Sequence, residues 1–163
     1  NLFSSGNFKY HAFEPDPDNY SLLSKYVADL STELQKNVTL HHCAVGDAAG
    51  HVSMVQGGDG TQLYKGVETG MTTPVVRLDE VLAREKASVI KMDIEGFEPL
   101  ALEGARGLLE KQRPALFICV YHRPEHLWSI PLWIHDLGLG YKLFLRHHGT
   151  SSSETVCYAL PAS

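Results

Sequence analysis

The chain of 163 residues predicts an α/β domain whose sheet is mostly parallel and ends in an antiparallel hairpin. Extended apolar segments alternate with segments whose apolar residues recur at helical spacing, the order of parallel crossover units. The last two extended segments are separated only by His147–Glu154. A parallel crossover needs about a dozen residues or more, so this pair is expected to be antiparallel. No internal repeat or linker is evident, and we expect one domain over residues 1–163.

The first strand–helix–strand unit is the most regular part of the pattern. Phe8–Phe13 predicts a strand, and Asp16 predicts a helix N-cap with Pro17 at the first helical position. Apolar residues then follow helical spacing for about four turns: Tyr20, Leu23, Val27, Leu30 and Leu34. Val38–Val45 predicts the next strand, which Gly46 and Asp47 end. We therefore expect two parallel strands joined by one helix.

The middle of the chain is less regular. His51–Val55 and Pro74–Leu78 predict short extended segments, and Gly57–Gly60 predicts a flexible turn. Residues 61–73 predict a loop. Asp79 is expected to cap a brief helix that extends to Arg84.

The second half of the chain predicts strands and helices in alternation. Ser88–Asp93 predicts a strand, and Ala115–Tyr121 is an apolar run typical of a strand covered on both faces. Between them one helical face carries apolar residues and ends at Arg113–Pro114: Phe97, Leu100, Ala101, Ala105, Leu108 and Leu109. Pro124–Leu137 predicts the last helix, in which Pro131 predicts a break or kink. The hairpin strands are expected at Tyr141–Arg146 and Thr155–Leu160.

Composition restricts the partners that the chain can have. The net charge is −5 and no basic patch stands out, which argues against nucleic acid as a main partner. The longest apolar run, Ala115–Tyr121, is too short to span a bilayer, and Asn1–Gly6 lacks the features of a signal peptide. Cys43, Cys119 and Cys157 lie in apolar segments and are odd in number, which predicts buried thiols in a reducing compartment. We expect a cytoplasmic protein without a membrane partner; the sequence does not indicate the oligomeric state.

Carboxylates concentrate where the strand Ser88–Asp93 ends. Asp93 and Glu95 share a face while the chain stays extended, and Gly96 permits a sharp turn. In parallel sheets, ligands bind beyond the carboxyl ends of the strands. The segment predicts either a functional site or a solvated turn whose acidic residues suit the dipole of the following helix.

Four segments in this order and spacing resemble the FkbM-type S-adenosylmethionine-dependent methyltransferases: Ala12–Pro17, Cys43–Asp47 with Gly50, Leu78–Leu82, and Ile90–Glu98. The resemblance covers nearly the whole chain. It implies a Rossmann-like class I methyltransferase fold, S-adenosylmethionine as cofactor, and methylation of a hydroxyl on a sugar or other small-molecule acceptor. The alternative is a non-catalytic interaction or remnant domain that keeps the fold without binding the methyl donor.

The resemblance also implies residues that bind the donor. Glu14 matches the acidic residue that accepts hydrogen bonds from the ribose hydroxyls, a role that suits a carboxylate because charge-assisted bonds are strong. Ala44, Val45 and Asp47 match the segment that brackets the adenine. Asp47 either accepts a hydrogen bond from the adenine amino group or stabilises the turn.

Methyl transfer to oxygen or nitrogen requires alignment, exclusion of water and removal of a proton. Asp93 and Glu95 match the segment near the amino acid moiety of the donor and near the acceptor. Asp93 and His122, which follows Ala115–Tyr121, are the candidate general bases, and the pKa of histidine suits that role. Alternatively, His122 is a hydrogen-bonded histidine at a strand end. Glu98 is expected to face solvent or to cap the following helix.

Two further clusters are candidate sites. His122 and His126 are four residues apart and could bind a metal with Asp93 or Glu95, but no recognised metal spacing is present, so no metal is predicted. The aromatic residues form either an acceptor pocket or helix-packing core: Tyr121, Trp128 and Trp133.

The chain departs from the family pattern at its start. The first strand and its glycine-rich turn are absent, because Gly57, Gly58 and Gly60 lie in the middle of the sequence. We therefore expect an N-terminally incomplete domain whose first strand and first helix are largely missing. The missing strand would lie between the strands that end at Glu14 and Asp93. The expected consequences are two unpaired sheet edges, poor folding or aggregation, and weak donor binding.

Overall fold

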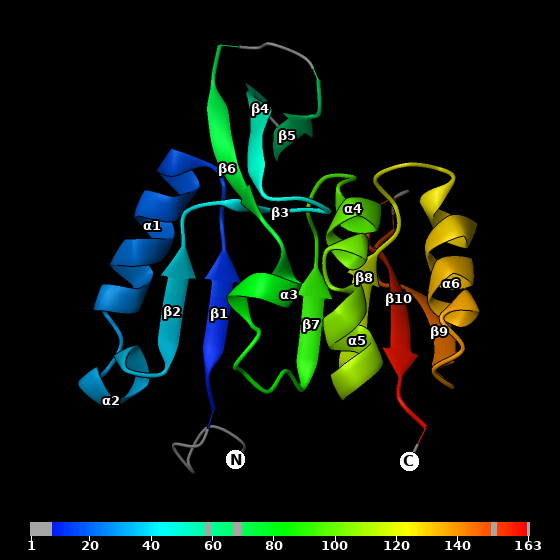
Figure 1. The fold of residues 1–163 in the computed structure, drawn as a ribbon. Coiled ribbons are helices and arrows are strands. Elements are labelled where there is room, and N and C mark those ends of the chain that lie inside the picture. Colours follow the sequence, from blue (N-terminus) through cyan, green and yellow to red (C-terminus); the bar gives the residue numbers. More distant parts are fainter. Residues whose placement is uncertain (1–7, 58–59, 67–69, 151–152, 163) are drawn as a thin grey trace. The chain divides into compact units, whose positions relative to one another are not determined.

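The computed structural model describes residues 8–57, 60–66, 70–150 and 153–162 (Figure 1). The chain divides into two compact units. Unit 1 comprises Asn1–Ala44 and Gly50–Val75, and unit 2 comprises Val45–Ala49 and Val76–Ser163. Each unit is described by itself below.

The strand–helix–strand part of unit 1 confirms the predicted parallel pairing. Its elements are β1 (Tyr10–Phe13), α1 (Pro17–Ala28), α2 (Thr32–Gln35) and β2 (Val38–His41). β1 and β2 are parallel, with Tyr10 opposite Val38. The Asp16 side chain accepts hydrogen bonds from the backbone nitrogens of Asp18 and Asn19, so it is the N-cap of α1. The predicted helix does not continue to Leu34: α1 ends before Asp29, and Ser31 caps the separate α2.

The middle of the chain is more ordered than its sequence predicted. The strands are β3 (Ala44–Val45), β4 (Gly50–Gly57), β5 (Gly60–Tyr64) and β6 (Thr72–Val76), in the sheet order β3-β6-β4-β5. β4 is antiparallel to both β5 and β6. The predicted loop 61–73 therefore contains most of β5 and the start of β6, because pairing with β4 satisfies their backbone groups. The predicted strand Val38–Val45 is also divided, since β2 and β3 belong to different sheets. Residues 58 and 59 of the predicted turn lie outside the described residues.

The sheet of unit 2 confirms the C-terminal antiparallel hairpin. Its strands are β7 (Val89–Met92), β8 (Ala115–Cys119), β9 (Lys142–His147) and β10 (Thr155–Leu160), in the order β7-β8-β10-β9. β7 and β8 are parallel, whereas β10 is antiparallel to both β8 and β9. The fold is α/β as predicted, but its sheets are mixed rather than mostly parallel, since β4 and β10 each form two antiparallel pairings.

The helices of unit 2 begin and end differently from the prediction. They are α3 (Leu78–Val81), α4 (Glu98–Glu103), α5 (Arg106–Gln112) and α6 (His126–Asp136). Asp79 does not cap α3, which follows Arg77, but lies within it. Its carboxylate instead accepts hydrogen bonds from the backbone nitrogens of Gly107 and Leu108, at 3.1 and 2.7 Å, and so satisfies free N–H groups at the start of α5.

The structure differs from two predictions about helix continuity, because one expected helix is divided and the helix that contains Pro131 is not broken. The single helix expected from Phe97 onward is two helices that Gly104 separates. A Cβ at Gly104 would lie 1.9 Å from the carbonyl oxygen of Gly46, so only glycine permits this close backbone approach. Conversely, α6 continues through Pro131 without an assigned break.

Large side chains that are almost completely buried concentrate in unit 2: Leu102, Leu109, Leu116, Ile118, Ile130 and Ile134. The thiols of Cys43, Cys119 and Cys157 are free and buried, as predicted. In contrast, α1 in unit 1 contains no buried residue. Within the described ranges, no helix is long and apolar enough to cross a membrane.

The expected open sheet edges are present. Among the residues that the structure describes, β1 is paired only with β2, and β7 is paired only with β8. Each of these strands is thus the edge of its sheet.

Candidate active site

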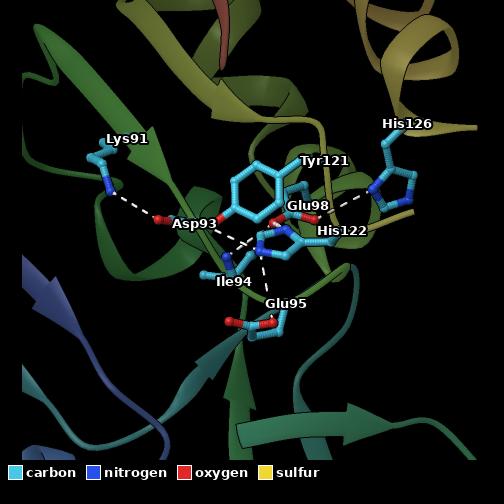
Figure 2. A network of polar contacts seen from close by, with 8 residues as sticks. All are labelled: Lys91, Asp93, Ile94, Glu95, Glu98, Tyr121, His122 and His126. Carbon is cyan, nitrogen blue, oxygen red and sulfur yellow. Dashed lines mark hydrogen bonds and ion pairs between the residues drawn. The ribbon is translucent and has the colours of Figure 1, made fainter. Parts of the chain in front are cut away.

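The candidate site in unit 2 lies at the carboxyl ends of two adjacent parallel strands (Figure 2). Asp93 follows β7 directly, and His122 follows β8 by three residues. Parallel pairing places both strand ends at one edge of the sheet. The structure therefore brings together Asp93, Glu95 and His122, as the sequence predicted.

The turn after Asp93 has an unusual backbone. Glu95 and Gly96 have positive φ angles of 55° and 92°. A Cβ on Gly96 would lie 3.0 Å from Nε of Arg123. Any other residue would also have a strained backbone at the positive φ of Gly96. Gly96 thus permits a tight turn after which Glu98 begins α4 and reaches back to the same site.

Carboxylates lie beside both ring nitrogens of His122. Nε2 lies 3.4 Å from Oδ1 of Asp93 and 3.7 Å from Oε2 of Glu95. Nδ1 lies 2.8 Å from Oε1 of Glu98, although this contact lacks good hydrogen-bond direction and is better described as an ion pair. Burial acts to lower the pKa of His122, but the contact with Glu98 and the charges of the other two carboxylates outweigh it and raise that pKa.

Asp93 remains more accessible than His122: their side chains are 34% and 6% exposed. The Tyr121 hydroxyl donates a 3.0 Å hydrogen bond to Oδ1 of Asp93, and Nζ of Lys91 lies 3.6 Å from Oδ2. Burial acts to raise the pKa of Asp93. Hydrogen bonds from Cys119 and Tyr121, with the charges of Lys91 and His122, outweigh burial and lower it, which favours the carboxylate.

The neighbours of Asp93 show the reciprocal effect. Burial and the Asp93 carboxylate raise the pKa of the Cys119 thiol to about 12, and they also raise the pKa of Tyr121. Both groups therefore remain protonated donors at neutral pH. This arrangement fits a carboxylate held as a hydrogen-bond acceptor.

Glu98 was predicted to face solvent or to cap the helix, and this prediction was wrong. Its side chain is completely buried, and Oε1 accepts a 2.9 Å hydrogen bond from the backbone nitrogen of Ile94. Its other oxygen, Oε2, lies 3.6 Å from Nδ1 of buried His126. Glu98 precedes Ala101 and Leu102 by three and four residues, so it shares their apolar helix face, a signal that the sequence did contain.

His126 lies near Glu98 but differs from His122 in the direction of its pKa shift. Burial lowers the pKa of His126, and the opposing charges of Glu98 and Glu125 do not offset this. The described part of the chain shows no group of three or more metal-ligating side chains that could hold an ion.

In unit 1, Glu14 lies directly after β1. Its Oε1 accepts a 2.8 Å hydrogen bond from the backbone nitrogen of Asp16, and Oε2 takes no part in that bond. Burial raises the pKa of Glu14, although the Asp16 N–H bond acts in the opposite direction. Ala44, also of unit 1, and Val45, of unit 2, are buried in β3, and Asp47 of unit 2 follows them.

The three aromatic residues do not share one set of contacts. Tyr121 binds Asp93, whereas the indole nitrogen of Trp133 donates to Glu103 and its ring contacts the Arg106 guanidinium. Trp128 is 56% exposed on α6. These contacts support neither alternative for the three residues together, the acceptor pocket or the helix-packing core.

Comparisons with known proteins identify the family of this chain and support its fold. The model of the methyltransferase FkbM domain matches residues 2–149. The fold is similar to the crystal structure of methyltransferase FkbM from Methylobacillus flagellatus KT, with a TM-score of 0.78 and 26% sequence identity. That similarity covers 93% of this chain but 36% of the other, so this chain spans about a third of that protein's length. No curated protein matches the chain significantly. The chain belongs to the FkbM methyltransferase domain family.

Proposed function

We propose that this domain transfers a methyl group from S-adenosylmethionine to a hydroxyl of a sugar or other small metabolite. The observation that carries the proposal is the pair formed by His122 Nε2 and Asp93 Oδ1, 3.4 Å apart at the carboxyl ends of β7 and β8. Such a pair can accept the proton that a hydroxyl loses when it is methylated.

The two members of the pair have different roles. Asp93 is partly exposed and ionised, so it accepts a hydrogen bond from the acceptor hydroxyl and orients it. His122 is buried behind it and takes the proton on Nε2. As the oxygen–methyl bond forms and the sulfur–methyl bond breaks, the hydroxyl proton moves to the pair and His122 becomes imidazolium. The nearby carboxylates stabilise that cation.

The residues present are chemically suited to the methyl donor, which supplies an electrophilic methyl on a sulfonium. Oε2 of Glu14 lies outside the bond to Asp16 and is suited to ribose hydroxyls. For the adenine we propose the segment that contains Ala44, Val45 and Asp47; the side chains of Ala44 and Val45 are buried in β3, and the Asp47 carboxylate would accept from the adenine amino group. Glu95, 38% exposed, is suited to the donor's ammonium group.

The test is methyl transfer from donor carrying a labelled methyl group to a panel of sugars and polyols, followed by mass spectrometry of the products. Wild-type protein is expected to label at least one hydroxyl compound, whereas Asp93→Asn and His122→Gln are expected to reduce labelling strongly. Glu110→Gln, an exposed carboxylate on α5, is the matched control. Transfer that is equally fast in all four proteins would contradict the assigned proton acceptor.

A second candidate, a non-catalytic interaction domain, is favoured by one observation: β1 and β7 are each paired on one side only in the described residues. An edge strand can add a strand from another polypeptide. This candidate predicts no saturable binding of S-adenosylmethionine. The free buried cysteines suit either candidate in a reducing compartment.

A further inference from the structure

The completely buried carboxylate of Glu98 has no place in the proton transfer described above. It lies at the start of α4, and the backbone nitrogen of Ile94 donates a 2.9 Å hydrogen bond to Oε1. A completely buried carboxyl group needs further hydrogen-bonding partners, because an unpaired buried polar group is destabilising. The nearby side chains that can supply them are two imidazoles.

Both imidazoles turn the same atom toward Glu98, as Figure 2 shows. Nδ1 of His122 lies 2.8 Å from Oε1, and Nδ1 of His126 lies 3.6 Å from Oε2. The side chains of His122 and His126 are 6% and 5% exposed, so water does not replace these contacts. Oε2 and both Nδ1 atoms lack a directed hydrogen bond in this structure.

The position of the ring proton of His122 follows from its surroundings. A neutral imidazole carries one N–H, and the partner of one nitrogen decides which nitrogen keeps the lone pair. The closest carboxylate oxygen to the ring is Oε1 of Glu98, beside Nδ1, whereas Asp93 and Glu95 lie farther from Nε2. The proton is therefore stabilised best on Nδ1.

We propose that Glu98 is a positioning residue that holds the proton of neutral His122 on Nδ1, so that the Nε2 lone pair faces Asp93 and Glu95. This inference rests on the proposed function, because His122 can take the proton of the acceptor hydroxyl only if its lone pair lies on the side of that hydroxyl. Glu98 itself does not touch the reacting atoms. It acts through His122 in the way that a buried carboxylate orients a catalytic imidazole.

Several charged groups of the described residues act on the two imidazoles. Asp93, Glu95 and Glu98 act on His122, and Glu98, Glu125, Arg123 and His122 act on His126. Removal of one carboxylate from either side of His122 therefore lowers the pKa of His122. Only removal of Glu98 also changes which nitrogen carries the proton.

The test is a pH titration of the 15N-labelled full chain by long-range 1H–15N correlation NMR, which distinguishes the two neutral tautomers. The spectrum of His122→Gln assigns the His122 signals. In wild type we expect the Nδ1–H tautomer above the pKa of His122. Glu98→Gln keeps the shape of the side chain but is expected to lower that pKa and to increase the Nε2–H fraction. Glu95→Gln, the control on the other side of the ring, should lower the pKa and preserve the Nδ1–H tautomer.

Neutral His122 protonated on Nε2 in wild type would overturn the inference, even if Glu98→Gln does not fold. A tautomer that changes equally in Glu98→Gln and Glu95→Gln would overturn it too. Failure of the proposed function can be distinguished from failure of this inference. Wild-type protein that has the Nδ1–H tautomer but transfers no methyl group would contradict the proposed function. Wild-type protein that transfers the methyl group but has the Nε2–H tautomer would contradict the role of Glu98.

Discussion

Glu14 directly follows strand β1, whereas Glu98 begins helix α4, and the two units hold these acidic residues differently. Glu98 is completely buried in unit 2 and contacts Ile94, His122 and His126. Glu14 in unit 1 is partly exposed and accepts a bond from Asp16, at the start of a helix that buries no residue. The comparison indicates that the imidazole proposed to accept the proton is held by buried groups of unit 2. Of the groups proposed to bind the donor, Glu14 is held by a more exposed part of unit 1, whereas Val45, Asp47 and Glu95 belong to unit 2.

The largest expected effect is on catalysis in unit 2. His122→Gln removes the proposed proton acceptor, and we expect the methyl-transfer rate to fall by about 10²- to 10⁴-fold, the usual contribution of a general base. The effect should appear in kcat more than in KM. A rate within a few-fold of wild type would show that the base lies elsewhere.

Stability should also distinguish the two units. Leu109→Ala in unit 2 truncates a side chain that is 0% exposed, so we expect the free energy of unfolding to fall by about 2–5 kcal/mol. Leu22→Ala on α1, where the side chain is 54% exposed, should change it by at most about 0.5 kcal/mol. Urea denaturation monitored by circular dichroism measures both variants. Equal losses would contradict the difference between the units.

The next effect concerns donor binding in unit 1. Glu14→Gln removes the charge of the proposed ribose acceptor, and we expect the Kd for S-adenosylmethionine to rise by about tenfold to a hundredfold, the range for charged hydrogen bonds. Calorimetry measures this change, with Glu33→Gln on α2 as a control. An unchanged Kd in Glu14→Gln would remove Glu14 from the donor site.

The smallest expected effect is the pH dependence of stability. The pKa of folded His122 is raised, so its stabilising contribution is complete below the unfolded pKa and is lost as pH rises through the folded value. His122→Gln should therefore lose more stability, relative to wild type, at pH 6 than at pH 9. Comparison with wild type at each pH separates this effect from that of His126, whose lowered pKa has the opposite sign. A larger loss at pH 9 would contradict the assigned charges.

Local patterns in the sequence predicted much of the fold. The Asp16 cap, the parallel pair β1–β2 and the antiparallel β10 all depend on neighbouring residues or short connections, and the structure confirms them. The division of the helix at Gly104 and the role of Asp79 could not be predicted, because both depend on residues distant in sequence. Gly104 permits contact with Gly46, and Asp79 binds backbone nitrogens of α5.

The distinction between local patterns and contacts distant in sequence also applies to the candidate site. Asp93, Glu95 and His122 could be predicted to meet because they follow the ends of adjacent parallel strands. An acidic residue in a first helical turn commonly faces solvent, so the prediction for Glu98 was wrong even though its spacing from Ala101 and Leu102 places it on their apolar face. Its contacts with two imidazoles arise only when β8 and α6 bring His122 and His126 to α4.

The most direct test of the central claim is calorimetric titration of the full chain with S-adenosylmethionine, with Glu14→Gln in parallel. The proposed methyltransferase predicts saturable binding, weaker than micromolar, that Glu14→Gln weakens further. No saturable binding at millimolar donor by folded protein would contradict the methyltransferase and favour the non-catalytic interaction domain.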